Sequence, residues 1–112
     1  MTDQAITFDD VLLVPSYNHH ESRRVVDTTS VDRLGKLTLE LPVISSNMDT
    51  ITESDMANFM SSKGAMGALH RFMSVEENIN EFKKCKGIVF VSIGCTAAEL
   101  ERAEALRDAG AD

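Results

Sequence analysis

Three helix-start patterns lie 22 residues apart in the second half of the sequence. In each pattern a hydroxyl residue precedes an acidic residue by three positions. The pairs are Thr52 and Asp55, Ser74 and Glu77, and Thr96 and Glu99. A hydroxyl just before a helix accepts from an early helical N–H, and an acid three residues later reaches back to the hydroxyl residue's own N–H. The spacing therefore predicts three helices of similar length, each beginning at its hydroxyl residue.

An apolar run precedes each predicted helix. The runs are VIS from Val43, AMGALH from Ala65 and IVFVSIG from Ile88, and such short apolar runs are typical of buried strands. Each predicted helix also ends near a glycine, which suits the left-handed position after a helix. These glycines are Gly64, Gly87 and Gly110. Strands that alternate with helices at this length predict βαβ crossovers and a parallel sheet, which is an α/β fold.

Residues 1–41 do not follow this repeat. FDDVLLVPSYN, from Phe8, is an apolar patch interrupted by Pro15, and VVDTTSVDRLGKLTLEL reads as two strands around a turn at Gly35. We therefore expect residues 1–41 to form a cover segment or hairpin, and residues 42–112 to form the strand-helix units.

Composition limits the kinds of partner. The 112 residues are 43% apolar and carry a net charge of −7, which fits one globular domain and argues against nucleic-acid or anionic-membrane surfaces. No apolar run could span a bilayer, and the acidic N-terminus is unlike a signal peptide, so we expect a cytoplasmic protein. Cys85 and Cys95 form no metal-ligand pattern with the three histidines, which predicts free thiols and no metal site.

Polar residues collect where the predicted strands end. Ligands of parallel α/β proteins bind at the carboxyl ends of the strands, and helix N-termini there favour an anion. Small polar residues after a strand are equally ordinary turn residues, and Arg71 could be a simple surface charge. The three clusters are Ser45 to Thr50; His70 and Arg71; and Ser92, Gly94, Cys95 and Thr96.

Four ordered motifs resemble the amino-terminal part of the IMP dehydrogenase and GMP reductase family. They are TFDDVLLVPS, PVISSNMDTITESDMA, GAMGALHRFMSVEE and VSIGC. The resemblance implies a purine-nucleotide oxidoreductase with a parallel (β/α)8 TIM-type barrel. The chain would hold an N-terminal cover segment and about the first three βα units of that barrel, which is a single, incomplete domain.

Three features favour GMP reductase within this family: Asn47 before MDT, SRRVVD from Ser22, and no paired CBS modules between HRFMSVEENINEFKK and GIVFVSIG. We therefore expect NADPH-dependent reductive deamination of GMP to IMP and ammonia in purine salvage. Two alternatives stay open. One is an IMP dehydrogenase without the CBS insert, which converts IMP to XMP with NAD, and the other is a non-catalytic nucleotide-binding α/β module.

The resemblance assigns ligand roles to six residues. The substrate-binding residues would be Ser46 and Met48, and the cofactor-binding residues would be Ser22, Arg23, His70 and Arg71. The Ser22 and Arg23 pair would reach NADPH at a neighbouring subunit, which implies a homo-oligomer, and the family is typically tetrameric. The family's nucleophilic cysteine follows the sixth strand, beyond these residues. We therefore expect no catalytic residue and no turnover from the 112 residues alone.

Overall fold

The computed structural model describes residues 5–32 and 35–111. Residues 33 and 34 of the predicted turn, and residues 1–4 and 112 of the two predicted segments, lie outside the described residues. The elements in chain order are η1 (Phe8–Asp10), η2 (Arg23–Val25), β1 (Ser30–Val31), β2 (Thr38–Leu39), β3 (Ile44–Ser45), α1 (Ser54–Ser62), β4 (Met66–Leu69), α2 (Val75–Lys84), β5 (Val89–Val91) and α3 (Ala97–Asp108). None of the described helices is long and apolar enough to cross a membrane.

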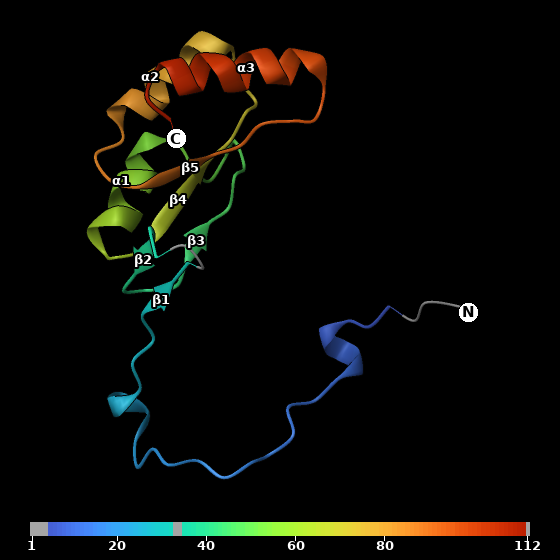
Figure 1. Ribbon diagram of the computed structural model, residues 1–112, viewed down its shortest axis with the longest axis vertical. Coiled ribbons are helices and arrows are strands. Elements are labelled where there is room, and N and C mark those ends of the chain that lie inside the picture. The colour runs from blue at the N-terminus through green and yellow to red at the C-terminus, as the bar shows by residue number, and fades with distance from the viewer. Residues whose placement is uncertain (1–4, 33–34, 112) are drawn as a thin grey trace.

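The three predicted strands form one parallel sheet in the order β3-β4-β5 (Figure 1). Ile44 lies opposite Met66, and Gly67 lies opposite Val89. Because neighbouring strands run in the same direction, their carboxyl ends meet at one edge of the sheet. The predicted α/β fold with a parallel sheet is therefore confirmed.

The helices follow one another along the sheet, since α1 contacts β3, β4 and α2, and α2 contacts α3. At Gly67 of β4 an added Cβ would lie 2.7 Å from the Cα of Ala57 in α1. The absence of a side chain at Gly67 therefore lets helix and strand backbones touch. The buried apolar residues of the described chain are Ala57, Ala65, Met66, Leu69 and Leu106.

Only one of the three predicted capping boxes forms. Ser74 Oγ accepts from the Glu77 N–H (3.2 Å), and Glu77 Oε2 accepts from the Ser74 N–H (2.9 Å). The prediction for Thr52 was wrong, because α1 has Glu53 at its N-cap and Thr52 is turned inward. Thr96 does precede α3, but in the described structure its side chain makes no capping hydrogen bond.

Helix ends follow the glycine prediction in two cases of three. Gly64 has φ +70° and Gly110 has φ +107°, which is the left-handed conformation that glycine adopts without strain. Gly87 is not among the described residues with positive φ, and α2 instead ends at Lys84 with Cys85 already extended. The glycine prediction was therefore wrong for α2.

The amino-terminal segment extends away from the sheet and its helices (Figure 1). β1 and β2 pair antiparallel, with Ser30 opposite Leu39 and Val31 opposite Thr38. The larger apolar side chains before β1 are mostly exposed, including Phe8 (96%) and Leu13 (97%). The division into a cover segment, 1–41, and barrel units, 42–112, stays a prediction.

Candidate functional site

Three loops meet at the carboxyl edge of the sheet, and we call this edge the rim. The loops are residues 46–53 after β3, 70–74 after β4, and 92–96 after β5. Asn47 Nδ2 donates to Ser92 Oγ at 2.7 Å, which joins the first loop to the third across the end of β4. The three polar clusters expected from the sequence therefore lie together.

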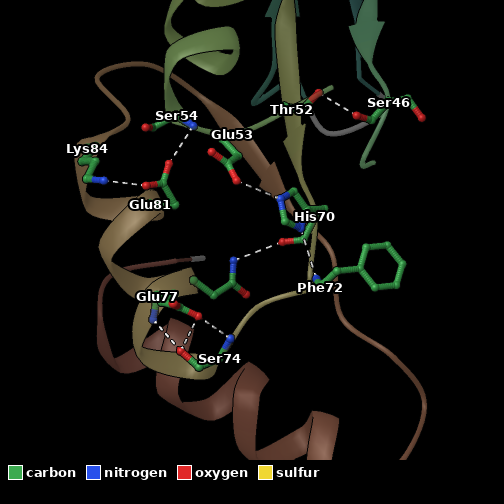
Figure 2. A network of polar contacts seen from close by, with 11 residues as sticks. Ser46, Thr52, Glu53, Ser54, His70, Phe72, Ser74, Glu77, Glu81 and Lys84 are labelled. Carbon is green, nitrogen blue, oxygen red and sulfur yellow. Dashed lines mark hydrogen bonds and ion pairs between the residues drawn. The ribbon is translucent and has the colours of Figure 1, made fainter. Parts of the chain in front are cut away.

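The first loop has a backbone held by hydrogen bonds and several exposed side chains, including that of Met48. Thr52 is fully buried; its Oγ1 donates to the Ser46 carbonyl at 2.6 Å and lies 2.9 Å from Ser45 Oγ (Figure 2). The Met48 carbonyl accepts from the N–H groups of Ile51 and Thr52, which closes a tight turn, while the Met48 residue stays 49% exposed. The sequence offered Thr52 only as a helix cap, so its role in holding Ser46 was missed.

His70 is buried at the end of β4, with 2% of its surface exposed. Its Nδ1 accepts from the Phe72 N–H at 3.1 Å, so in the neutral ring Nε2 carries the proton and can donate to Glu53 Oε1 at 3.4 Å (Figure 2). The His70 carbonyl accepts from Asn78 Nδ2. The ring is thus engaged on both sides by the protein itself.

Arg71 and Phe72 present a cation and an aromatic ring at the rim. The Arg71 side chain is 41% exposed, and its guanidinium lies 5.4 Å from the centroid of the Phe72 ring. Phe72 is itself 64% exposed, and Figure 2 shows its ring directed away from the contacts around His70. An exposed aromatic with a cation over it suits a ligand that carries both a planar base and negative charge.

Glu99, in the first turn of α3, connects two loops of the rim. Its carboxylate accepts from the Gly94 N–H at 3.0 Å, and it pairs with Arg102 Nε at 3.3 Å and Arg71 Nη1 at 3.7 Å. The hydrogen bond from Gly94, followed by the two cations, lowers the pKa of Glu99 below its ordinary value. Glu99 therefore stays ionised near neutral pH.

Arg102 lies in α3 and binds the backbone of the second loop. Arg102 is 9% exposed, and its Nη2 donates to the Met73 carbonyl (3.0 Å) while Nη1 donates to Asn78 Oδ1 (3.2 Å). Asn78 in turn donates to the His70 carbonyl. The buried chain of contacts fixes the backbone that carries Arg71.

Ser22 and Arg23 do not join this rim. They lie at η2 in the amino-terminal segment, which Figure 1 shows extending away from the sheet. Ser22 Oγ accepts from the Arg24 N–H at 3.3 Å, which is a local bond within the segment. Both predicted ligand residues, Ser22 and Arg23, are exposed. The structure thus gathers Ser46, Met48 and Arg71 at one edge and leaves the Ser22–Arg23 pair apart.

A hollow of about 380 Å³ lies between the first loop of the rim and α1, but its lining does not suit a phosphate group. Three carboxylates border it, and a phosphate-bearing ligand would be repelled by them. The lining residues are Asp49, Thr50, Ile51, Glu53, Asp55, Met56 and Phe59. The part of the rim that carries the partly exposed Arg71 is the better candidate for a phosphate.

Cys85 does not offer an activated thiol. Both Cys85 and Cys95 are free in the described structure. Cys85 Sγ donates to the Glu81 carbonyl at 3.4 Å, and burial raises the pKa of this thiol. A raised pKa keeps the thiol protonated and poorly nucleophilic.

The parallel sheet and its polar carboxyl edge define an α/β protein of the kind that binds small ligands at strand ends. The model of the "IMP dehydrogenase / GMP reductase domain" matches residues 5–112. The chain therefore belongs to the IMP dehydrogenase and GMP reductase family, as the motifs had indicated.

Individual relatives carry the name of one branch of this family. The chain is 46% identical over 84 residues to an inosine-5'-monophosphate dehydrogenase of Nitrosopumilus maritimus, covering 74% of this chain and 17% of that protein. It is 43% identical over 83 residues to the enzyme of the same name from Staphylococcus aureus, again covering 74% of this chain and 17% of the relative. These relatives favour the dehydrogenase alternative over the expected GMP reductase.

A solved structure is more similar still. The crystal structure of inosine 5' monophosphate dehydrogenase from Legionella pneumophila matches with 87% identity and a TM-score of 0.83, covering 97% of this chain and 34% of that chain. The chain thus spans about a third of this solved structure and about a sixth of the curated relatives. At 87% identity the likeness extends beyond the fold to most of the side chains.

Proposed function

We propose that the protein is an NAD-dependent IMP dehydrogenase, which converts IMP to XMP, and that the chain supplies part of its nucleotide-binding barrel. The observation that carries this proposal is the 87% identity to the Legionella pneumophila dehydrogenase over 97% of the chain. NAD replaces the NADPH of our initial expectation, and IMP replaces GMP as substrate. The dehydrogenase without a CBS insert was the first alternative to the reductase.

The side chains of the second loop fit a dinucleotide. The partly exposed Arg71 guanidinium suits a diphosphate, and the exposed Phe72 ring suits a planar base. NAD supplies a hydride acceptor when it is bound. In this proposal Arg71 contacts the dinucleotide, whereas the buried His70 orients Arg71 and Phe72 through its bond to the Phe72 N–H.

The first loop fits the purine nucleotide. Met48 offers a flexible apolar side chain that can pack on a base, and Ser46 offers a hydroxyl. Thr52 holds the Ser46 carbonyl, so the loop is shaped before a ligand arrives. We assign binding and orientation to these residues, and the nucleophile to a cysteine outside the 112 residues.

The remaining assignments concern the whole protein. β3 and β5 each have a neighbour on one side only within the described sheet, and further strands of a (β/α)8 barrel would pair with them. A homo-oligomer, expected to be a tetramer in the cytoplasm, follows from the family resemblance. In this assembly the exposed Ser22–Arg23 pair would contact the dinucleotide bound at a neighbouring subunit.

A paired assay on the longest natural form of the protein tests the proposal. NADH should appear with IMP and NAD, and NADPH should not be consumed with GMP. NADPH loss with GMP alone would instead establish the reductase, and Arg23→Ala should then raise the KM for NADPH. The absence of both reactions, in protein shown to be folded, would favour the non-catalytic nucleotide-binding module.

A further inference from the structure

Glu99 occupies a place where the protein has gathered donors for an anion. A backbone N–H from Gly94 and the guanidinium groups of Arg71 and Arg102 all face its carboxylate, at 3.0, 3.7 and 3.3 Å respectively. These groups come from two loops of the rim and from α3. A backbone N–H with two guanidinium groups is the donor set that proteins commonly use to hold a phosphate.

Two further observations show that this place is built around a negative charge. An added Cβ at Gly94 would lie 2.9 Å from Glu99 Cγ and 3.4 Å from Arg71 Nη1, so the carboxylate reaches the loop only because Gly94 has no side chain. Arg102 Nε is buried and, within the described residues, has no hydrogen-bond partner. Its contact with Glu99 is an ion pair, and Glu99 is the carboxylate that balances this buried cation, whose other nitrogens donate to Met73 and Asn78.

The charges of the cluster determine what else can bind there. Arg71 and Arg102 contribute two positive charges and Glu99 one negative charge, which leaves a single net positive charge on the side that Arg71 exposes. One net positive charge can attract a diphosphate. An additional phosphate beside Glu99 would meet a carboxylate that already uses the Gly94 N–H, and like charges at this distance repel strongly when partly buried.

We propose that Glu99 is a specificity-determining residue whose carboxylate fills this anion position and makes the rim prefer a dinucleotide without an additional phosphate, NAD, over one that carries it, NADP. The proposal rests on the proposed function, because it takes the rim as the dinucleotide site. Glu99 acts in two ways: it occupies the donors, and it offsets the charge of Arg71.

The test compares NAD and NADP in the longest natural form of the protein. For wild type, Glu99→Gln and Glu101→Gln, the dissociation constant of each dinucleotide is measured by calorimetry, and kcat/KM of each is measured with IMP. Glu101 is exposed and lies two residues further along the same helix, so Glu101→Gln removes the same charge away from the rim. We expect Glu99→Gln to reduce the preference for NAD over NADP by about 5- to 20-fold and Glu101→Gln to leave it unchanged.

Glu99→Asp separates the effect of the lost charge from the effect of a less stable fold. The aspartate keeps the negative charge on a shorter side chain, so it should retain most of the preference for NAD even if its thermal midpoint falls. An unchanged NAD preference in folded Glu99→Gln protein would overturn the proposal. Equal losses of preference in Glu99→Asp and Glu99→Gln would overturn it too, since charge would then not be the cause.

Failure of the proposed function would look different. A wild-type protein that binds NADP better than NAD, or that consumes NADPH with GMP, would remove the dehydrogenase assignment before any variant is compared. A wild-type protein that oxidises IMP with NAD, and whose preference survives Glu99→Gln, would remove only the role of Glu99.

Discussion

At the scale of single residues, a tight packing constraint lies between strand β4 and helix α1. A Cβ added at Gly67 would stand 2.7 Å from Ala57 Cα and 2.9 Å from Ala57 Cβ. Both atoms belong to or adjoin the helix backbone, so they cannot move aside as the end of a long side chain can. Gly67 therefore sets the distance between α1 and the sheet, and with it the position of the first loop of the rim.

Gly67→Ala should destabilise the protein by about 1–3 kcal/mol, because an overpacked core must shift helix or strand. Urea unfolding of the longest natural form measures the loss. Adding Ala57→Gly removes the nearer side-chain atom, so the two changes together should cost at least about 0.5 kcal/mol less than the sum of the single changes. Simple additivity, or a Gly67→Ala protein as stable as wild type, would contradict this packing.

The residue scale is also where sequence reasoning was least reliable. The patterns at Thr52, Ser74 and Thr96 are nearly identical in the sequence, yet only Ser74 caps its helix. Thr52 instead bonds to the Ser46 carbonyl, and Glu99 bonds to the Gly94 N–H. A capping pattern in the sequence shows which donors and acceptors are available. Which of them form hydrogen bonds depends on the conformation of the folded loops.

At the scale of elements, the start of α1 is held by a neighbouring helix. The Ser54 N–H donates to Glu81 Oε2 of α2 at 3.0 Å, and Glu81 also pairs with Lys84 (Figure 2). The contacts with Lys84 and then Ser54 lower the pKa of Glu81 from 4.5 to about 2. Glu81 thus takes the place that Thr52 was expected to fill, and a partner 27 residues away could not be read from the local pattern.

Glu81 should therefore give the protein a pH-dependent part of its stability. Its pKa is lower in the folded state, so the stabilisation is complete above about pH 4.5 and is lost as the pH falls toward 2. Glu81→Gln should cost about 1 kcal/mol at pH 7, a typical value for a lost helix cap, and the difference from wild type should shrink as the pH approaches 2.

Denaturant unfolding at a series of pH values measures this effect. Glu76→Gln is the matched control, because Glu76 lies exposed on the same helix and should leave stability within about 0.5 kcal/mol at every pH. A constant difference between Glu81→Gln and wild type from pH 7 to pH 3 would show that the charge of Glu81 contributes nothing.

The elements themselves were largely predictable. The apolar runs at residues 43–45, 65–70 and 88–94 contain β3, β4 and β5, and the strand-helix alternation predicted their parallel pairing.

The reaction type could not be predicted from the loop residue Asn47. Its residue type suggested a reductase, whereas the named relatives are dehydrogenases. One loop residue cannot decide the reaction when the proposed nucleophile lies outside the chain.

At the scale of the whole molecule, much apolar surface is uncovered within the described chain. Ile44 and Phe90 lie on the sheet face opposite to that of Gly67, which contacts α1, and they are 49% and 48% exposed. The amino-terminal segment adds Phe8 and Leu12, both more than 90% exposed. A parallel sheet is normally covered on both faces, so this chain should need further protein to cover it.

The 112-residue polypeptide prepared alone should bind the apolar dye ANS and self-associate. Exposed apolar surface and the unpaired edges of β3 and β5 both favour contact between copies. Dye fluorescence and light scattering at increasing concentration measure the two effects, with the longest natural form as the control that should show little of either. A single species near 12.3 kDa without dye binding would show that the polypeptide covers this surface by itself. The proposed completion of the barrel by further strands would then lose its physical reason.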